Sequence, residues 1–452
     1  MVTPARRIAF EILRRVEAEG AYSGELLHAR LSDSRTPIKR EDAALVTELT
    51  LGVLRSQRLL DFLIERQTGK PVAALDLEVL LALRLGLYQL RFLSRVPASA
   101  AVNESVELVK AARKRSAAPL VNAVLRKSPR EAIEKLLPEA LSPETRLGIQ
   151  HSHPDWLVAR WLVCFGESRT MALLEANNRA PRLACAVHQP AQRDAIEQEL
   201  RHGGMDVEPG AWLRNALLIR GGNPAATESF RCGALSMQDE ASQMVAHLLG
   251  VRAGDSVLDL CAAPGGKTAI LARAAGSQSL VIAADVHVRR LQSMSATLSR
   301  LGIASIQQVA LDATASLPFG RPFTKILVDA PCSGTGTLAR NPEIRWRLQP
   351  QDLADLHRRQ VALLKNAIGQ LAVGGRLVYS TCSLEPEENE RVLQAALQDV
   401  SGLRRVTAIS ELQPHLREGA DAARLFSPDG VFRTFPPEHG TVGFFAAAIE
   451  RE

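Results

Sequence analysis

Two short cysteine motifs are the residues of this chain best suited to chemistry. DAPCSGTG spans 329–336 and contains Cys332, and STCS spans 380–383 and contains Cys382. Each motif follows an apolar run that is typical of a buried strand. Open α/β sheets bind their ligands at the carboxyl ends of the strands, and a thiol placed there can attack a substrate. The sequence therefore predicts two neighbouring thiols with different tasks.

A loop of small residues precedes the cysteine motifs. The run SVLDLCAAPGGKT at 256–268 predicts a strand, a tight loop and a helix start, where backbone N–H groups can bind a carboxylate or a phosphate. A P-loop ATPase is one alternative, but Cys261 occupies the position of the first glycine in G-x-x-x-x-G-K-[ST]. The G-x-G-x-x-G pattern of a dinucleotide site is absent.

Three aspartates end successive predicted strands. Asp285 closes SLVIAAD, 19 residues after Gly266, where a carboxylate can bind both hydroxyls of a ribose. Asp312, in VALDA, could hold an adenine amino group, and Asp329 opens the first cysteine motif. A helix cap or a local turn is the alternative role for any one of them. Their joint placement predicts a cofactor that contains a ribose.

The scaffold for these motifs is a strand-and-helix alternation in the second half of the chain. Five apolar runs, each followed by a loop and mostly by a helical stretch, predict a parallel sheet covered on both faces. They lie at 256–260, 280–284, 306–311, 326–328 and 376–379. Two further runs, 431–434 and 442–449, predict a final antiparallel pair.

The first half of the chain has a different pattern. Apolar residues up to about residue 130 recur at helical spacing, as in Ile8, Ile12, Leu13 and Val16, which predicts an all-α bundle. A helix with two tryptophans and two short strands follow, which indicates a small α+β subdomain. We therefore expect three domains, at 1–142, 143–236 and 237–452.

The charge of the chain is unevenly distributed. Residues 1–130 hold 22 Lys and Arg against 14 Asp and Glu, a net +8, so that the remainder carries −2 of the overall +6. This asymmetry favours a nucleic acid as the partner of the N-terminal third, with ordinary solubilising charge as the alternative. Seven basic residues fall within 21 positions: Lys110, Arg113, Lys114, Arg115, Arg126, Lys127 and Arg130.

Cysteine usage and hydropathy restrict the class of protein further. The six cysteines form no C-x-x-C pair, so neither a disulfide framework nor a zinc site is predicted, and we expect no metal. The N-terminus has no apolar leader and no long uncharged apolar run follows. We expect a cytoplasmic protein without a membrane partner.

From Met237 to the C-terminus the sequence closely resembles the S-adenosylmethionine-dependent RNA cytosine-C5 methyltransferases. The motifs that match in order are DLCAAPGGKT (259–268), AAD (283–285), LDA (311–313), DAPCSGTGT (329–337), RNPEIRW (340–346) and YSTCSLEPEENE (379–390). VPASAAVNESVELVK (96–110) and LVNAVLRK (120–127) are similar to the RNA-binding helical domain of the antitermination factor NusB. Together they resemble the bacterial subgroup, the RsmB, Sun or Fmu type, that methylates C5 of a cytosine in 16S ribosomal RNA.

The resemblance implies a fold, a partner and roles for individual residues. It implies a NusB-like bundle, an intermediate α+β subdomain and a Rossmann-like methyltransferase domain that makes 5-methylcytosine in ribosomal RNA. We expect RNA rather than DNA as partner and a monomer. Cys382 would attack C6 of the base, Cys332 would assist release, and Asp329 would hydrogen-bond the base. The residues implied for cofactor binding are Cys261, Ala262, Ala263, Pro264, Gly265, Gly266, Lys267, Asp285, Asp312 and Asp329.

Three alternatives stay open at this stage. DNA cytosine methyltransferases share the chemistry but attack with the thiol of the Pro-Cys motif, so Cys332 is the alternative nucleophile. Transfer RNA is the alternative substrate, because close relatives of the catalytic domain act on it. A non-catalytic RNA-binding assembly factor is the alternative from another functional class.

Overall fold

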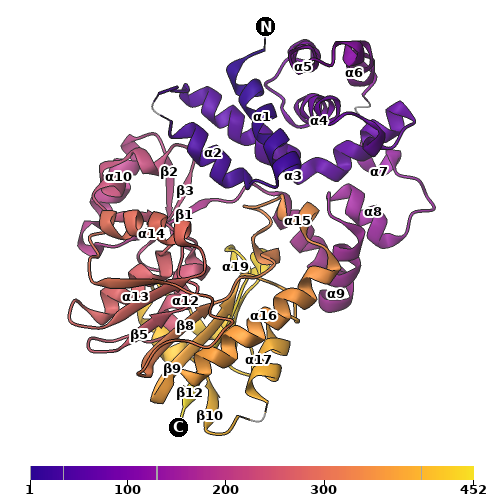
Figure 1. Ribbon diagram of the computed structural model, residues 1–452. Coiled ribbons are helices and arrows are strands. Elements are labelled where there is room, and N and C mark those ends of the chain that lie inside the picture. Colours follow the sequence, from indigo (N-terminus) through magenta and orange to yellow (C-terminus); the bar gives the residue numbers. More distant parts are fainter. Residues whose placement is uncertain (1, 34, 129–130, 399) are drawn as a thin grey trace. The chain divides into compact units, whose positions relative to one another are not determined.

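The computed structural model describes residues 2–33, 35–128, 131–398 and 400–452 (Figure 1). These residues form two compact units. One, the helical unit, comprises residues 1–181 together with Leu338–Arg347. The other, the sheet unit, comprises Arg182–Thr337 and Leu348–Glu452. The predicted domain boundaries at 142/143 and 236/237 stay a prediction, because compactness alone does not separate functional domains.

The helical unit confirms the predicted all-α first part. Its helices up to residue 150 pack around one apolar core that contains Ile8, Leu60 and Leu81. Gly20 and Gly69 end the first and third helices in the left-handed conformation, with φ of 67° and 65°, which suits a residue without a side chain. The helices are α1 Pro4–Glu19, α2 Ser23–Leu31, α3 Arg40–Thr68, α4 Leu77–Phe92, α5 Ala98–Ala111, α6 Ala118–Arg126, α7 Ile133–Leu136, α8 Pro143–Gln150 and α9 Asp155–Asn178.

A segment from the C-terminal half of the sequence is part of this helical unit. Leu338–Arg347, which ends in α15 (Ile344–Arg347), lies between two elements of the sheet unit in the sequence. The fully buried guanidinium of Arg345 donates to Ser152 O and to Asn178 Oδ1, both at 2.9 Å. Ser23 donates through its N–H and its hydroxyl to the buried carboxylate of Glu343, each at 2.9 Å. The RNPEIRW motif is therefore anchored among the N-terminal helices.

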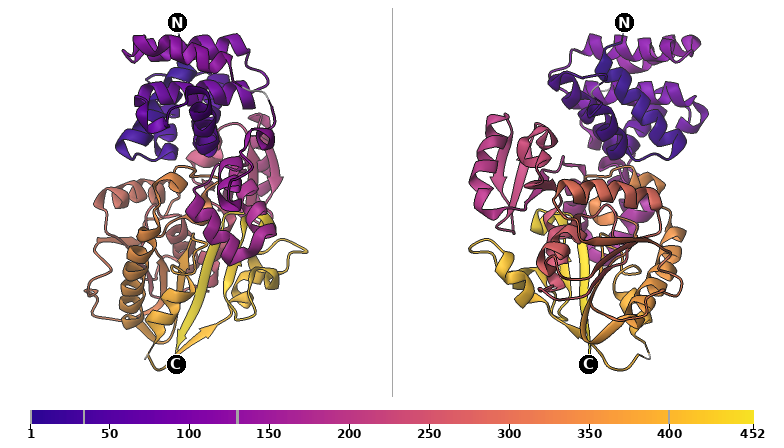
Figure 2. Two further views of the ribbon diagram at one scale, coloured as in Figure 1. Left: turned by 90° about the vertical axis from the view of Figure 1, so that its right-hand side faces the viewer. Right: turned by 60° about the vertical axis from the view of Figure 1, so that its left-hand side comes forward.

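The sheet unit begins with the strands of the predicted small α+β subdomain, drawn in magenta to pink in the right view of Figure 2. The helix with two tryptophans that was expected in this subdomain is α9, which lies in the helical unit. Four antiparallel strands pair in the order β2-β3-β1-β4. Their bounds are β1 Leu183–Val187, β2 Asp206–Pro209, β3 Ala216–Arg220 and β4 Leu235–Met237. Helix α10 (Arg193–His202) covers them through Ile196 and Leu200, which pack with Cys185 and Leu217. The short helix α11 spans Glu228–Arg231.

The main sheet contains all five predicted parallel strands. Its order is β10-β12-β9-β8-β5-β6-β7, and β11 pairs with β12. Strands β5 to β9 are parallel to one another. Strand β12 pairs antiparallel with β9, β10 and β11, and its pairing with β11 confirms the predicted final pair. The bounds are β5 Val257–Asp259, β6 Val281–Asp285, β7 Ile306–Ala310, β8 Phe323–Asp329, β9 Leu371–Thr381, β10 Leu403–Val406, β11 Phe432–Thr434 and β12 Phe444–Arg451.

Both faces of the main sheet are buried, as expected for parallel strands. Alternate residues point to opposite faces: Leu327 and Val378 pack with α12, α13 and α18, whereas Ile326 and Leu377 pack with α16 and α17. The helices are α12 Glu240–Leu248, α13 Gly266–Ala275, α14 Val288–Arg300, α16 Pro350–Gly369, α17 Glu390–Leu397, α18 Ile409–Leu412 and α19 Pro436–His439. Within the described ranges, no helix is long and apolar enough to cross a bilayer.

Candidate active site

The two cysteine motifs meet, as the sequence predicts. Strands β8 and β9 are parallel neighbours, with Asp329 paired to Ser380 in register, so both motifs leave the same edge of the sheet. The Sγ atoms of Cys332 and Cys382 lie 3.3 Å apart, within hydrogen-bonding distance for sulfur, and both side chains are half-buried. The bond to the Cys382 sulfur, together with burial, raises the pKa of Cys332 well above its usual range. Burial and the neighbouring sulfur therefore favour the protonated form of Cys332, and either sulfur can be the donor of this contact.

The loops that carry the thiols are in close backbone contact. Gly336 N–H donates to Cys382 O at 2.9 Å, and Gly443 N–H donates to Gly336 O at 2.8 Å. A Cβ atom at Gly336 would lie 2.3 Å from Gly443 O, which leaves no room for a side chain. The second glycine of the DAPCSGTG motif is thus required by packing against the residue before β12 rather than by the chemistry of the thiols.

Asp329 is held on both sides by polar neighbours. Its Oδ2 accepts from Lys267 Nζ at 2.7 Å, and its Oδ1 accepts from Ser380 Oγ at 2.8 Å. The Lys267 ammonium also lies over the Phe444 ring, 5.1 Å from its centroid. Lys267 therefore forms its ion pair with Asp329. Helix α17, which follows the second thiol loop, begins at Glu390.

The small-residue loop joins β5 to α13 beside Asp285. Gly265 adopts φ of +97°, and its N–H donates to Ala262 O at 2.8 Å, which closes a tight turn before the helix. The buried Asp285 carboxylate accepts from Ala263 N–H at 3.3 Å and from His287 N–H at 2.9 Å. Asp285 therefore fixes the loop while it lies at the carboxyl end of β6.

Two other polar residues at this edge have contrasting environments. Asp259, at the end of β5, is fully buried; its Oδ2 accepts from Thr268 Oγ1 at 2.7 Å, while its Oδ1 has no partner among the described residues. Burial raises its pKa to about 7. Asp312 is exposed after β7 and accepts from Thr314 N–H at 2.9 Å, the local turn that was the alternative to a cofactor role.

Sequence reasoning missed a buried carboxylate between the two thiol loops. Glu388 accepts from Ser333 N–H at 2.8 Å and from the hydroxyls of Ser333 and Ser383. Asn389 adds a bond from its Nδ2 to Ser383 O at 3.0 Å. The only signal in the sequence is the acidic run EPEENE after STCS, and that run does not reveal which carboxylate turns inward.

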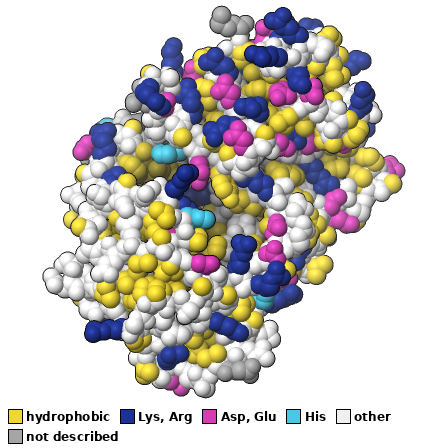
Figure 3. All heavy atoms as spheres, in the orientation of Figure 1, with side chains coloured by type: hydrophobic (Ala, Val, Ile, Leu, Met, Phe, Trp, Pro, Cys, Tyr) yellow, Lys and Arg dark blue, Asp and Glu magenta, His cyan; other side chains and the backbone are white. Residues whose placement is uncertain are grey.

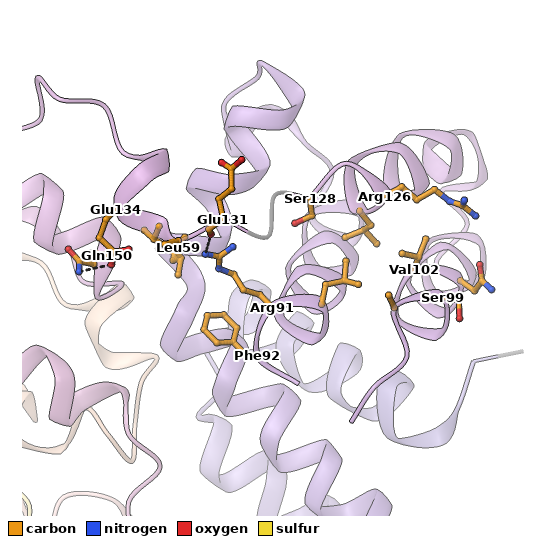
Figure 4. A pocket seen from close by; sticks show the side chains of 16 residues that line it. Leu59, Arg91, Phe92, Ser99, Val102, Arg126, Ser128, Glu131, Glu134 and Gln150 are labelled. Atoms are coloured by element: carbon orange, nitrogen blue, oxygen red, sulfur yellow. Dashed lines mark hydrogen bonds between the residues drawn. The ribbon is translucent and has the colours of Figure 1, made fainter. Parts of the chain in front are cut away.

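The helical unit has a cavity of its own, of about 890 Å³ (Figure 4). Leu59, Phe92 and Val102 supply apolar lining, and Arg91 donates to Glu131 O at 2.8 Å across one side. Among the described residues, none of those predicted for catalysis or cofactor binding lines it.

Comparisons with known proteins match all three parts of the chain. Residues 246–450 match the family 16S rRNA methyltransferase RsmB/F, residues 3–130 the NusB family, and residues 153–226 the ferredoxin-like domain of RsmF/B-like methyltransferases. A probable ribosomal RNA small subunit methyltransferase B of Bacillus subtilis is 32% identical over 454 residues, which cover 100% of this chain and 99% of the relative. The chain belongs to the RsmB/F family.

Further RsmB relatives and solved structures agree. The ribosomal RNA small subunit methyltransferase B of Pseudomonas putida is 36% identical over 399 residues, covering 87% of this chain and 90% of the relative. The crystal structure of PH0851 matches with a TM-score of 0.83 at 25% identity over 100% of both chains. A methyltransferase homologue from Pyrococcus horikoshii matches with a TM-score of 0.57 at 27% identity, covering 69% of this chain and 100% of the other.

These matches confirm the family, the enzyme class and the fold class expected from the sequence. RsmB/F proteins are S-adenosylmethionine-dependent methyltransferases of ribosomal RNA, and this chain combines their NusB-type helical part, ferredoxin-like part and methyltransferase sheet. Family membership does not by itself assign the roles of individual residues.

Proposed function

We propose that this enzyme transfers a methyl group from S-adenosylmethionine to C5 of one cytosine in 16S ribosomal RNA through a covalent Cys382–cytosine adduct. The observation that carries the proposal is the pair of thiols 3.3 Å apart at the ends of adjacent strands. C5 of cytosine is a poor nucleophile unless a second group first adds to C6. Two adjacent thiols suit this reaction, because one can add to C6 and the other can assist release of the methylated base.

The residues at the sheet edge fit the cofactor. S-adenosylmethionine, when bound, supplies an electrophilic methyl group on sulfur. The buried Asp259 Oδ1 and Gln238 Oε1 have no donor among the described residues, and both flank the loop before α13, so N–H groups of a ligand such as an ammonium would satisfy them. We propose that 261–267 hold the methionine part, Asp285 the ribose and Asp312 the adenine.

Cys382 is proposed as the attacking sulfur. Its thiolate adds to C6 of the base, and the electron pair of the C5–C6 double bond moves toward C5. C5 then bonds to the methyl carbon as the bond from that carbon to the donor sulfur breaks, with the bonding pair left on that sulfur. The resemblance of YSTCSLEPEENE (379–390) to the RNA branch of the cytosine methyltransferases supports this assignment. Cys332 as the nucleophile remains the alternative.

Release requires a proton to leave and one bond to break. A base removes the proton from C5, the C–H electron pair restores the C5–C6 double bond, and the sulfur leaves C6 with the bonding pair. Cys332, adjacent to that sulfur, is placed to assist this step. The Asp329 carboxylate keeps free lone pairs beyond its bonds to Lys267 and Ser380, and we propose that it binds the base at N3.

The helical unit is proposed to bind RNA phosphates rather than to do chemistry. Figure 3 shows many Lys and Arg side chains, interspersed with acidic ones, over its visible face. Of the basic cluster predicted from the sequence, Lys110 pairs with Glu107 and Lys114 with Asp76, at 2.8 and 3.0 Å. Arg130 lies outside the described residues. Those with no carboxylate partner within the described part of the chain are Arg113, Arg115, Arg126 and Lys127.

The substrate is tested by in vitro methylation. Unmodified 16S ribosomal RNA, the same RNA in small-subunit particles, and bulk transfer RNA are each incubated with enzyme and methyl-labelled S-adenosylmethionine, with Cys382→Ala as the inactive control. We expect 5-methylcytosine at one position of 16S ribosomal RNA. Methylation of transfer RNA alone would favour the alternative substrate, and methylation of another base atom would refute the proposal. A ribosomal RNA substrate would also place the enzyme in the cytoplasm.

A further inference from the structure

The Glu388 carboxylate contacts both thiol loops through their serines. It lies in the turn between β9 and α17 and has no solvent exposure. Its Oε1 accepts from Ser333 N–H at 2.8 Å and from Gln360 Nε2 at 2.9 Å. Its Oε2 accepts from the Ser333 and Ser383 hydroxyls. A carboxylate offers about four lone-pair positions, so these four donors use them all.

These contacts act on the residues that flank the thiols in sequence. Ser333 follows Cys332 directly, and Ser383 follows Cys382 directly. Gln360 Nε2 also donates to Pro331 O at 2.9 Å, on the other side of Cys332. Glu388 thus contacts the residue after Cys332 directly, the residue before Cys332 through Gln360, and the side chain of the residue after Cys382. The two loops also contact each other directly, through the Ser333 and Ser383 hydroxyls at 3.1 Å and through Gly336 N–H to Cys382 O at 2.9 Å.

We propose that Glu388 is a positioning residue that sets the distance between the Cys332 and Cys382 sulfurs. The effect of Glu388 on catalysis rests on the proposed function, in which both thiols act on one base. The effect of Glu388 on the distance between the sulfurs is independent of that function, because this distance can be measured without RNA or methyl donor.

Substitutions at Glu388 separate geometry from charge. Glu388→Gln keeps one oxygen for the two N–H donors and can turn its amide N–H groups toward the serine hydroxyls, which also accept hydrogen bonds. Glu388→Ala removes all four contacts. If the role is positioning, glutamine rescues what alanine loses. If the role is a catalytic charge, both variants fail alike.

The separation of the thiols is measured with phenylarsine oxide on the full-length protein. One arsenic atom binds two adjacent thiols, forming two As–S bonds and releasing one water. Mass spectrometry of the digested protein then shows whether the arsenical joins the Cys332 and Cys382 peptides. Cys332→Ser and Cys382→Ser are the controls that cannot form the bridge.

We expect wild type and Glu388→Gln to form the bridge with similar affinity, and Glu388→Ala to form it at least tenfold more weakly. Should Glu388→Ala fail to fold, the double variant Ser333→Ala with Ser383→Ala removes both hydroxyl contacts and is expected to weaken the bridge in the same direction. Equal bridging by wild type and the folded alanine variants would overturn the proposal.

Activity gives a second, separate measurement. Glu388→Ala is expected to lower kcat for methyl transfer at least tenfold while the calorimetric affinity for S-adenosylmethionine stays within twofold, with Glu388→Gln restoring most of kcat. A bridging loss without any methyl transfer by wild type would contradict the proposed function but not the positioning role. Normal bridging in a Glu388→Ala variant with lost activity would contradict the positioning role alone.

Discussion

Replacing Gly336 by alanine tests whether the thiol loops are held by direct backbone packing. The new Cβ would lie 2.3 Å from Gly443 O and 2.7 Å from its carbonyl carbon, and neither backbone atom can move aside as a flexible side chain could. One loop must shift by about an ångström to reach ordinary contact. That shift breaks or weakens the bonds from Gly336 N–H to Cys382 O and from Gly443 N–H to Gly336 O.

The expected cost follows from these contacts. Two backbone hydrogen bonds contribute about 0.5–1.5 kcal/mol each, and forcing extra volume into a packed site costs about 1–3 kcal/mol. Gly336→Ala should therefore lower the free energy of unfolding by about 2–6 kcal/mol. At roughly 2–4 °C per kcal/mol for a unit of this size, the melting temperature should fall by about 4–24 °C.

A matched control lies in the same unit. Gly369 is exposed at the end of α16, and a Cβ there would meet no atom within 4 Å, so Gly369→Ala should be neutral or stabilise by up to about 1 kcal/mol. Both variants are compared with wild type by scanning calorimetry and by denaturant unfolding. If Gly336→Ala unfolds within about 0.5 kcal/mol of Gly369→Ala, backbone packing does not fix the thiol loops and this reasoning is wrong.

Two further predictions concern charge. Because burial raises the pKa of Asp259 to about 7, the folded protein holds a proton that the unfolded chain releases near pH 4, so stability falls as pH rises between these values. At about 1.4 kcal/mol per pH unit, wild type should lose up to about 4 kcal/mol more than Asp259→Asn over this range; parallel stability–pH curves would refute the shift. Replacing four exposed basic side chains of the helical unit with glutamine should reduce the salt dependence of RNA binding; they are Arg113, Arg115, Arg126 and Lys127. The slope of the logarithm of the binding constant against the logarithm of the salt concentration should become shallower by up to about 0.7–0.9 per lost phosphate contact, with S-adenosylmethionine affinity unchanged. An unchanged slope would exclude these residues from the RNA interface.

Substitution of these side chains is a cleaner test than deletion of the N-terminal residues. Leu338–Arg347 folds with the helical unit, where Arg345 and Glu343 are buried against α2, α9 and the preceding loop. Truncation would expose these buried charges and disturb the chain directly after the Cys332 motif. A loss of activity in a truncated protein would then not report on RNA binding alone.

The sequence predicts the meeting of the thiols because it depends on local patterns. Two apolar runs end in cysteine motifs, and parallel neighbouring strands bring such ends together, as Cys332 and Cys382 confirm. The position of Leu338–Arg347 depends instead on contacts with residues about 170–320 positions away, such as Ser23 and Asn178. No spacing rule within the motif indicates those partners.

Glu388 shows a second limit of sequence reasoning. The acidic run after STCS holds four glutamates close together, Glu385, Glu387, Glu388 and Glu390. Their burial depends on how the turn before α17 folds back on the thiol loops.

Asp312 shows the opposite case. The pattern at the strand ends predicts a cofactor contact, whereas its carboxylate bonds Thr314 in a local turn that the sequence permits equally. Its role with the cofactor stays a prediction.

The order in which the two thiols act is the central claim, and one experiment tests it most directly. Cys332→Ala and Cys382→Ala are each incubated with substrate RNA and S-adenosylmethionine and run on denaturing gels. If Cys382 attacks and Cys332 assists release, Cys332→Ala accumulates a protein–RNA adduct that resists denaturation, and Cys382→Ala forms none. An adduct in Cys382→Ala and none in Cys332→Ala would contradict the account and make Cys332 the nucleophile.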